Sequence, residues 1–387
     1  MRLAFLCSGL EPGRDGVGDF ARTLTRHCAD LGHEIRLAAV REQAGAGEVS
    51  SPTGELRLHD IFQRPDEARK LAEWLQEFQP DWVSVHFTPF GFHPRGLGAQ
   101  RAARLREWLP ASARRHIMLH EIWLQPGRDG SLRHRALGWA QRRSVDAWAG
   151  PGWRPALVHT QARLHRARLQ ARGVTVELLP LCTNFEGRKI LRTEARAAMK
   201  DWPNPDAQKN STDAYWIGHF GAFHDQGWDF TAFAKKIASH PDLSGKRISF
   251  LALGRAQAAS AAFAEAARNV SGANFHVIGE LAAEKIPLAL QACDAAFTST
   301  PWDIIEKSGT VAAWRALDVP VLVTRAGATD AAQLPPWPDP GLFLADAKSP
   351  LAFSPLVERV PGPSFLNPVE TARAFLSALE NAPTSHS

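Results

Sequence analysis

Short apolar runs alternate along this chain with longer segments in which apolar residues recur every three or four positions. The short runs hold five to eight residues and end in glycine or polar turns, which is typical of strands buried on both faces. The longer segments have the period of amphipathic helices. Strands that alternate with helices indicate parallel sheets, so the predicted fold class is α/β.

The alternation occurs in two successive series. The first contains the predicted strands RLAFLCS, EIRLAAV, DWVSVHF, HIMLH, ALVHT and VELLPL, and the second contains YWIGHFG, RISFLALG, FHVIG, DAAFTST and PVLVT. Between them, residues 201–214 hold two prolines, two asparagines and few apolar side chains, so a linker or surface loop is expected. Residues 368–379 are expected to form one amphipathic helix.

Length and composition narrow the class of protein. A chain of 387 residues is long for one hydrophobic core, which favours two domains. Its apolar runs are far shorter than the roughly 20 residues that span a bilayer, and no secretory segment is evident, so a cytoplasmic protein is expected. Four cysteines lie singly in apolar stretches, without zinc-site spacing, and are expected to be buried thiols: Cys7, Cys28, Cys182 and Cys293.

The formal net charge of +5 conceals a strongly basic region. Residues 101–172 hold fifteen arginines, no lysine and only four acids. These arginines either cover solvated helical faces or contact an anionic partner. The anionic partner would be the inner membrane face, bound peripherally, or an anionic acceptor. Nucleic acid is not expected, because no known module with interleaved aromatic residues accompanies them.

A glycine-rich loop, EPGRDGVGDF, follows the first predicted strand. Gly13, Gly16 and Gly18 leave the main chain open to a phosphate or a sugar, at the edge of a parallel sheet where ligands collect. A helix from about Asp19 would add its positive dipole end. The spacing is neither the dinucleotide fingerprint nor a P-loop. The alternative is a flexible turn with Asp19 as the helix cap.

The second series has a comparable junction. After DAAFTST, the segment PWDIIEKSGTVAAW predicts a helix that opens at Ser308, Gly309 and Thr310, whose amides suit a diphosphate. Glu306 precedes this helix by about one turn and could bond sugar hydroxyls. Alternatively, Glu306 is a capping acid.

These segments together resemble the GT-B glycosyltransferases of family 4, in which two Rossmann-like domains face each other across a cleft. The matching segments occur in the same order as in the family. They are the glycine loop with its helix and second strand, then HIMLHEIWLQPG, VELLPLCTNFE, FGAFHDQGWDF and EKSGTVAAWRALDVPVLVT. It implies an acceptor-side domain over 1–185, a nucleotide-sugar-binding domain over 186–365, and a helix within 366–387 that packs back on the first domain.

The resemblance also implies a function. It is the transfer of a sugar, of hexosyl type, from a nucleotide-sugar donor to a glycan, a lipid-linked acceptor or a small molecule, as in polysaccharide biosynthesis. Family members are usually retaining and need no metal or other cofactor, so the diphosphate must be stabilised by amides and cationic side chains. The donor-binding residues are predicted to be Gly16, Gly18, Gly221, Arg255, Lys307, Ser308, Gly309 and Thr310, and the catalytic residues His120, Glu306 and Asp19.

Each predicted catalytic residue keeps an alternative, and three positions depart from the family pattern. His120 matches a histidine that faces the transferred sugar, although a packed and hydrogen-bonded histidine is the alternative. Asp19 would be the base of an inverting enzyme. The second acid of the paired-glutamate motif is replaced by Trp314, and the two basic diphosphate residues are replaced by Ala222 and Gln226. A binding protein without turnover and a nucleotide-sugar epimerase therefore remain alternatives.

Overall fold

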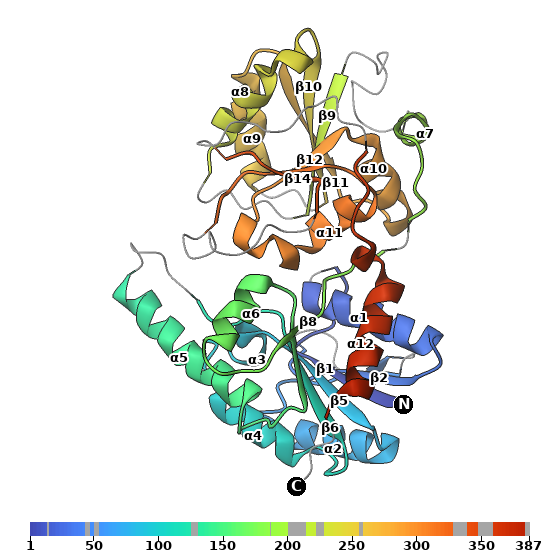
Figure 1. Ribbon diagram of the computed structural model, residues 1–387, viewed down its shortest axis with the longest axis vertical. Coiled ribbons are helices and arrows are strands. Elements are labelled where there is room, and N and C mark those ends of the chain that lie inside the picture. Colours follow the sequence, from blue (N-terminus) through green and yellow to red (C-terminus); the bar gives the residue numbers. More distant parts are fainter. Residues whose placement is uncertain are drawn as a thin grey trace. The chain divides into compact units, whose positions relative to one another are not determined.

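The chain folds into two compact units, each built on one sheet with flanking helices (Figure 1). Unit 1 comprises Met1–Asn184 and Asn367–Ser387, and unit 2 comprises Phe185–Leu366. The computed structural model describes residues 1–13, 15–42, 47–49, 54–124, 131–185, 187–199, 214–221, 228–254, 258–327, 339–346 and 359–383. Within these ranges no helix is both long and apolar enough to cross a bilayer.

Unit 1 contains a sheet with the strand order β3-β4-β2-β1-β5-β6-β7-β8. All neighbouring strands are parallel except the β3–β4 pair. The six strands predicted for this half are present, whereas β3 and β4 were not predicted. The strands are β1 (Arg2–Cys7), β2 (Glu34–Ala39), β3 (Gly47–Val49), β4 (Glu55–Arg57), β5 (Trp82–Phe87), β6 (Arg114–Leu119), β7 (Leu157–Thr160) and β8 (Glu177–Leu178).

Helices cover both faces of this sheet, and the last of them comes from the end of the chain (Figure 1). The predicted helix 368–379 is present and extends two residues further, because Asn367 caps it and Asn381 ends it. The helices of unit 1 are α1 (Gly16–Asp30), α2 (Pro65–Phe78), α3 (Pro89–Phe92), α4 (Ala99–Glu107), α5 (Leu132–Ala149), α6 (Arg163–Gln170) and α12 (Pro368–Asn381).

The two faces of the unit 1 sheet differ in chemistry. One face is apolar and packs against α2, α4 and α5 through residues such as Val83, Val85 and Ile117. The other face, under α1 and α12, carries Phe5 together with a layer of buried histidines. The ring of Phe375 in α12 lies 5.7 Å from the Phe5 ring and 5.2 Å from the His116 ring. A polar layer therefore lies inside an otherwise apolar domain.

Unit 2 contains a fully parallel sheet with the order β11-β10-β9-β12-β13-β14. The five predicted strands are present, and β14 is an additional one. With both sheets predominantly parallel and flanked by helices, the predicted α/β class is confirmed. The strands are β9 (Ala214–Phe220), β10 (Arg247–Leu253), β11 (Ala273–Gly279), β12 (Ala295–Thr298), β13 (Val321–Val323) and β14 (Leu342–Leu344).

The helical elements of unit 2 begin before its first strand. The residues that precede the expected linker belong to this unit, because Gln291 bonds the backbone of Arg188 and Ile190, at 3.1 and 2.7 Å. The linker itself lies outside the described residues up to Ala214. The α-helices are α7 (Arg192–Ala198), α8 (Phe230–Ala238), α9 (Ala258–Arg268), α10 (Ile286–Ala292) and α11 (Gly309–Ala316), and the 3-10 segments include η3 (Ala283–Lys285) and η4 (Trp302–Lys307).

All four cysteines are free and buried, as predicted. Burial raises the pKa of the Cys182 thiol to about 11 and that of the Cys28 and Cys293 thiols to about 12. Thiols with such pKa values stay protonated and unreactive at neutral pH. They act as small apolar side chains of the two cores.

Candidate functional site

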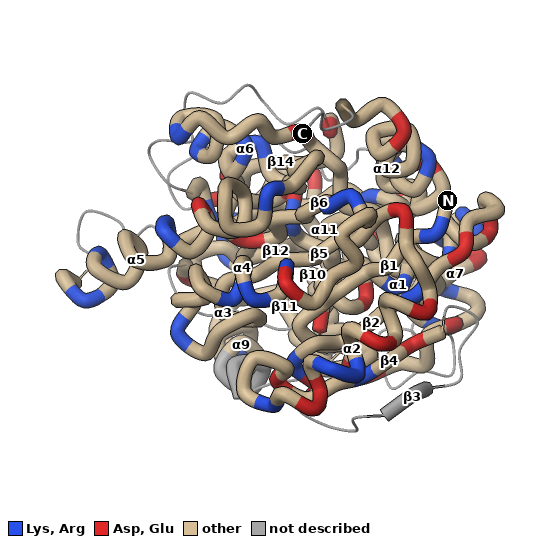
Figure 2. The backbone as a smooth tube through the Cα atoms, turned by 90° about the horizontal axis from the view of Figure 1, so that it is seen from below, with Lys and Arg blue, Asp and Glu red and all other residues tan. Residues whose placement is uncertain are grey.

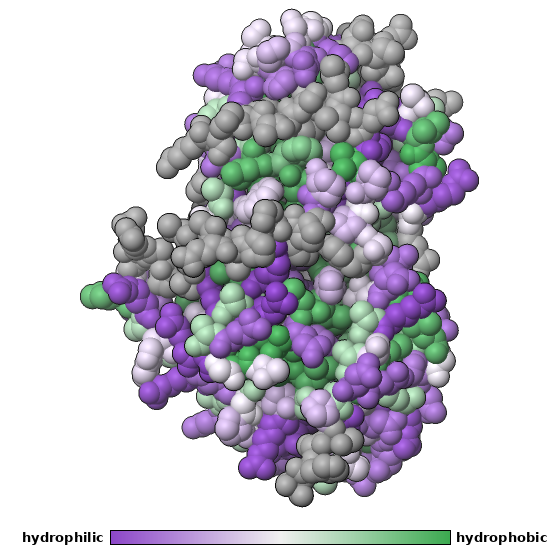
Figure 3. Space-filling model, viewed as in Figure 1, coloured by the Kyte–Doolittle hydropathy of each residue, from purple (hydrophilic) through white to green (hydrophobic). Residues whose placement is uncertain are grey.

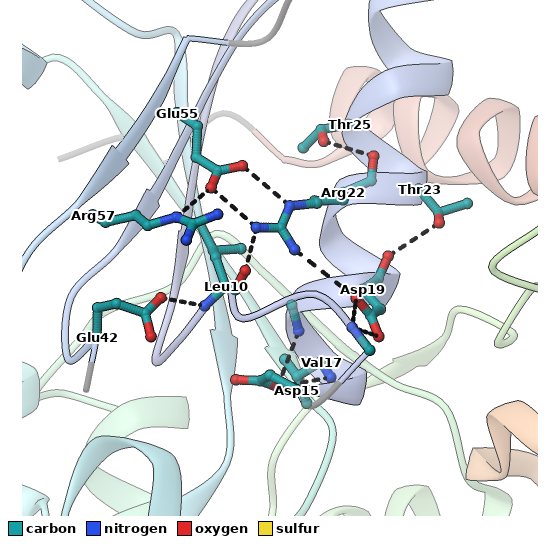
Figure 4. A network of polar contacts seen from close by, with 12 residues as sticks. Leu10, Asp15, Val17, Asp19, Arg22, Thr23, Thr25, Glu42, Glu55 and Arg57 are labelled. Atoms are coloured by element: carbon teal, nitrogen blue, oxygen red, sulfur yellow. Dashed lines mark hydrogen bonds and ion pairs between the residues drawn. The ribbon is translucent and has the colours of Figure 1, made fainter. Parts of the chain in front are cut away.

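The glycine-rich loop leads from β1 into α1 at the carboxyl edge of the unit 1 sheet. The helix begins at Gly16, three residues earlier than predicted, and its cap is Asp15 rather than Asp19. The Asp15 carboxylate accepts hydrogen bonds from Val17 N at 3.0 Å and Gly18 N at 3.1 Å (Figure 4). Asp19 lies in the first turn, and its carboxylate accepts from Gly13 N at 3.1 Å. Carboxylates therefore already bind amides that the sequence offered to a phosphate.

A third carboxylate reinforces this pattern. Glu42 accepts a hydrogen bond from Leu10 N at 2.9 Å, next to the cap. The pKa of Asp15 is raised, mainly by burial and further by the charges of Asp19 and Glu42, which outweigh its two backbone hydrogen bonds. A group whose charge is already disfavoured by its acidic neighbours marks a negative electrostatic potential. The start of α1 is consequently unfavourable for a diphosphate.

The expected donor contacts of Gly16 and Gly18 are affected differently. A Cβ on Gly18 would lie 2.7 Å from the Gly9 carbonyl oxygen, so Gly18 is needed for the loop to pack on the helix. Its amide donates to Asp15, so this amide is already bonded within the loop. Gly16 has open space where a side chain would project.

An arginine-carboxylate network links the same loop to α1 and β4 (Figure 4). Arg22 of α1 donates to the Leu10 carbonyl and to both Glu55 oxygens, at 3.0 and 3.1 Å from the carboxylate. Arg57 donates to Glu55 at 2.7 Å. Burial alone would raise the pKa of Glu55, but the bonds from Arg22 and Arg57 outweigh it and lower that pKa. The loop is thus fixed by charged groups on α1 and β4.

His120 lies at the end of β6 in a buried hydrogen-bonded chain. His86 Nδ1 and His120 Nε2 are 3.0 Å apart, and His120 Nδ1 is 3.2 Å from Gln161 Oε1. Because an amide oxygen only accepts, His120 carries its proton on Nδ1 and accepts from His86 through Nε2, with the Gln161 amide assigned as in the structure. Both ring nitrogens are thereby engaged within unit 1, as in the packed alternative.

The hydrogen-bonded chain includes a histidine whose pKa is lowered. Burial, together with the neighbouring His120, lowers the pKa of His86 well below its ordinary value. A bond from His120 to a sugar would require its ring to leave Gln161 or His86. The expected sugar contact of His120 is therefore closed in the described arrangement.

A second row of hydrogen-bonded side chains, from β5, β6 and β7, lies on the same face of the sheet. Ser84 Oγ lies 2.8 Å from His116 Nδ1, and His116 Nε2 lies 3.0 Å from His159 Nδ1. All three side chains are buried, and burial lowers the pKa of His159 to about 4. Since no solvent reaches Ser84, this chain has a structural role rather than that of a hydrolytic triad.

In unit 2, α11 begins where the sequence predicted. Ser308 is the cap and accepts from Val311 N at 3.4 Å. Hydroxyl groups line the helix start, with Ser308 Oγ 3.4 Å from Thr300 Oγ1 and 3.1 Å from Thr310 Oγ1. The first two helix amides, on Gly309 and Thr310, have no partner among the described residues. Space is open where Gly309 would carry a side chain.

The strand ends of unit 2 meet at this helix start. Gly221, directly after β9, has φ 91° and donates to the Leu253 carbonyl at 3.0 Å. A Cβ at Gly221 would lie 2.8 Å from Thr310 Cγ2, so the turn approaches α11 more closely than another residue type would allow. Amides, hydroxyls and a glycine turn thus converge at the carboxyl edge of the sheet.

Of the other positions that the sequence analysis singled out in unit 2, some are described by the structure and some are not. Glu306 is buried at the end of η4, beside Lys307. It is not the cap of α11, because Ser308 has that role, and the capping interpretation of Glu306 is wrong. Arg255, Ala222 and Gln226 lie outside the described residues.

Trp314 occupies the core of unit 2. It is 1% exposed, and a Cβ at Gly218 would lie 2.3 Å from its Cη2 atom. The indole therefore fills the space above β9 and offers no carboxylate for a ribose. Among the described residues, no group of three or more histidine, cysteine or acidic side chains could hold a metal ion.

Several residues of the site were not predicted. Asp15 and Glu42 bind loop amides, and His86 and Gln161 hold His120. The sequence carried a signal for Asp15, since an aspartate directly before a helical segment is a favoured cap. It also placed His86 near the end of a predicted strand, but not beside His120. Glu42 and Gln161 come from neighbouring loops and strands, whose pairing the sequence does not show.

No protein-family model and no curated protein matches the sequence. Solved structures do match the fold. An E. coli trehalose-6-phosphate protein bound with UDP-2-fluoro-glucose is 12% identical over 98% of this chain and 99% of its own, with a TM-score of 0.56. The lipopolysaccharide outer core galactosyltransferase WaaB is 10% identical over 85% of this chain and 83% of its own, at 0.51.

A third match is UDP-GlcNAc 2-epimerase from Methanocaldococcus jannaschii. It is 11% identical over 98% of this chain and 99% of its own, with a TM-score of 0.51. Similarity at this level of identity concerns the fold. The two units are Rossmann-like domains of the GT-B fold, as the sequence predicted.

Proposed function

We propose that this protein is a glycosyltransferase that binds the diphosphate of a nucleotide-sugar donor at the start of α11 in unit 2. The observation that carries the proposal is the pair of amides on Gly309 and Thr310, which have no partner among the described residues, beside the hydroxyls of Ser308 and Thr310. Helix N-termini with such amides favour phosphate through direct hydrogen bonds and the helix dipole. The UDP-sugar bound by the E. coli fold relative supports the same class of ligand.

The two glycine-rich junctions have different roles in this proposal. At α1, the carboxylates of Asp15 and Asp19 already accept amide protons, so this end suits hydroxyl groups of a neutral sugar or acceptor. At α11, the cap is an uncharged serine, so an anion meets no fixed negative charge from the cap. Phosphate binding is therefore assigned to unit 2 alone, and the α1 loop to hydroxyl recognition.

In the reaction, the bond between the anomeric carbon and the β-phosphate oxygen breaks, and a bond to an acceptor hydroxyl oxygen forms. The acceptor hydroxyl gives its proton to the departing β-phosphate oxygen on the same face of the sugar, and until that transfer the nucleoside diphosphate carries the additional negative charge. We assign the stabilisation of this charge to the α11 amides, the Ser308 and Thr310 hydroxyls and the ammonium of Lys307, without a metal ion. Glu306 is assigned to the sugar hydroxyls, with retention of configuration.

Calorimetry with UDP, GDP, ADP and their glucose conjugates tests the donor site, with a matched pair of variants. Gly309 and Gly16 are each the first residue of a helix, and each has open space at the Cβ position. Gly309→Leu is expected to weaken nucleoside diphosphate binding at least tenfold, because the side chain would project over the two amides. Gly16→Leu is the control and should leave the affinity for UDP, GDP and ADP unchanged, since the proposal assigns no phosphate to α1.

Loss of binding in Gly16→Leu, with Gly309→Leu unaffected, would reverse the assignment of the two junctions. Absence of binding to every nucleotide would refute the donor site altogether. The metal-free mechanism is tested by adding EDTA to the transfer assay. Undiminished donor turnover is expected, whereas loss of turnover that Mg²⁺ or Mn²⁺ restores would contradict it.

Epimerisation is the second candidate, because the epimerase from M. jannaschii matches 98% of this chain in fold. Incubation with UDP-GlcNAc in the absence of an acceptor distinguishes the two. Formation of a 2-epimer, followed by proton NMR, would favour epimerisation over transfer. Binding of the nucleotide sugar without transfer, hydrolysis or epimerisation would instead indicate a binding protein, in keeping with the loss of an acid at Trp314.

A further inference from the structure

Helix α5 (Leu132–Ala149) is buried along only part of its length. Its second half packs in unit 1 through Gln141, Val145 and Trp148. In its first half, residues 131–136 are all exposed. Figures 1 and 2 both show this end of α5 extending away from the rest of unit 1. The projecting half is therefore a surface that the rest of unit 1 does not cover.

The projecting half carries large apolar side chains. Leu132 is 82% exposed and Trp139 is 56% exposed. With Ala136 and Arg143 they follow a spacing of four, three and four residues, so these side chains lie along one face of the helix. In Figure 3, hydrophobic and hydrophilic atoms lie side by side where α5 projects. Helical turns without packing are marginal in water, and an apolar face on them indicates a binding surface.

The charges along the projecting half of α5 all have one sign, and the first acid of the helix, Asp146, lies in the packed half and pairs with Arg172. Residues 131–145 contain four arginines and one histidine and no acid. Arg133, Arg135 and Arg143 are exposed, and the Arg143 guanidinium lies 4.2 Å from the centre of the Trp139 ring. Figure 2 shows the basic positions near the end of α5. The partner must therefore be anionic and must also accept leucine and tryptophan side chains.

We propose that the first half of α5 docks on the surface of an anionic lipid bilayer. Leu132 and Trp139 enter the boundary between headgroups and acyl chains, while the three exposed arginines bind lipid phosphates. A helix that combines an apolar stripe, a tryptophan and flanking arginines has the composition of an interfacial helix. Arginine reaches from the apolar layer to the headgroups because its long stem is apolar. Docking goes beyond sugar transfer and does not depend on it.

The test is co-sedimentation of the full-length protein with vesicles of phosphatidylcholine, with and without phosphatidylglycerol, at low and high salt. Binding is expected with the anionic vesicles, and salt should weaken it. The charge variant Arg133→Glu/Arg135→Glu should partition about 25-fold or more weakly, since each basic residue near the surface contributes about fivefold. The apolar variant Leu132→Ser/Trp139→Ser should bind the same vesicles more weakly and release more completely at high salt.

Matched controls change the same residue types at exposed positions elsewhere. Arg69→Glu/Arg268→Glu makes the same change in net charge, and Leu191→Ser/Val277→Ser removes two other exposed apolar side chains. Both controls should bind anionic vesicles within about twofold of the unmodified protein. Circular dichroism and nucleotide calorimetry on every variant establish folding and the state of the donor site independently of lipid.

Equal binding to neutral and anionic vesicles would overturn the proposal, as would α5 variants that bind like the controls. If the projecting half pairs with a second copy instead, light scattering will show a dimer that Leu132→Ser/Trp139→Ser dissociates, without vesicle binding. That outcome also overturns lipid docking. Because vesicle binding is measured without nucleotide, its failure is distinct from a failure of the donor site.

Discussion

The capping carboxylate of Asp15 determines whether the amides of the first glycine-rich loop are available to an anionic ligand. A glycine-rich strand-to-helix junction suggests phosphate, yet one capping carboxylate accepts two of its amides and opposes a further anion. The uncharged Ser308 in the same position at α11 leaves the amides of Gly309 and Thr310 to a ligand. In the proposed assignment, the identity of the cap residue distinguishes the helix start that suits hydroxyl groups from the one that suits a diphosphate.

Replacing Asp15 by Asn and by Ala separates its hydrogen bonds from its charge. Burial raises the pKa of Asp15, so the folded state binds its proton more tightly than the unfolded chain does. The free energy of unfolding therefore falls as pH rises from the ordinary value of 3.8 through the folded pKa. At pH 7, Asp15→Asn should be at least as stable as the unmodified protein, because Asn caps equally well without the charge.

Asp15→Ala should lose about 1 kcal/mol at the same pH, because the cap is removed. Urea denaturation followed by circular dichroism measures both changes. A loss in Asp15→Asn as large as that in Asp15→Ala would show that the charge itself stabilises the loop, against this interpretation.

At the scale of elements, neighbouring strands build a buried polar layer on one face of the unit 1 sheet. The parallel register places Ser84 beside His116 and Met118 beside His159, so histidines from β5, β6 and β7 face the same helices. The hydrogen bonds between neighbouring rings need one nitrogen that accepts, so they require neutral histidines. Among the described residues, His86 Nε2 and Gln161 Nε2 are buried without a partner. Burial lowers the pKa of His86 and His116 well below the ordinary value.

This layer makes unit 1 sensitive to acid. The pKa of His159 falls from an ordinary 6.5 to about 4 in the folded state, so between these values the unfolded chain binds more protons. The free energy of unfolding is full above pH 6.5 and decreases as pH falls, by about 3 kcal/mol for a shift of this size. His159→Asn keeps a polar partner for His116 without a titrating ring.

Thermal unfolding at pH 7.5 and pH 5 should show a smaller loss of stability in His159→Asn than in the unmodified protein. His240→Asn is the control, since His240 is only partly buried and outside this layer. Equal pH dependence in all three proteins would mean that His159 does not titrate on unfolding in this range.

The strands were predictable because burial on both faces leaves an apolar run, as in RLAFLC and AAFT. The three-residue strands β3, β4 and β14 were not predicted. In β4, Glu55, Leu56 and Arg57 form no apolar run, and the strand is held by pairing with β2 and β3. β14 is apolar but has only three residues. Ser308 and the start of α11 were predictable from local capping chemistry. The hydrogen bonds of His120 were not predictable. Its partners His86 and Gln161 are 34 and 41 positions away in sequence and become neighbours only through the order of the strands.

At the scale of the whole molecule, the chain leaves unit 1 after Asn184 and returns to it at Asn367. The returning helix α12 covers the histidine face, where Phe375 contacts the rings of Phe5, His116 and His159. Arg114 of β6 also donates to the carbonyl of Ala382 at 2.8 Å, just after α12. Unit 1 is therefore incomplete without α12, whereas unit 2 is continuous in sequence.

This connectivity predicts that damage to α12 affects the stability of unit 1 and leaves the donor site of unit 2 intact. Phe375→Ala removes a fully buried ring and should lower the free energy of unfolding of unit 1 by about 3 to 5 kcal/mol. Arg373→Ala, on the exposed face of the same helix, should change it by less than about 0.5 kcal/mol. Differential scanning calorimetry with and without a nucleoside diphosphate makes the comparison, because the ligand stabilises only the unit that binds it. For Phe375→Ala, the expected result is a lowered unfolding temperature of unit 1 that the nucleotide does not shift, together with unchanged nucleotide affinity. A Phe375→Ala protein that loses nucleotide binding while still folded would show that the proposed donor site depends on unit 1.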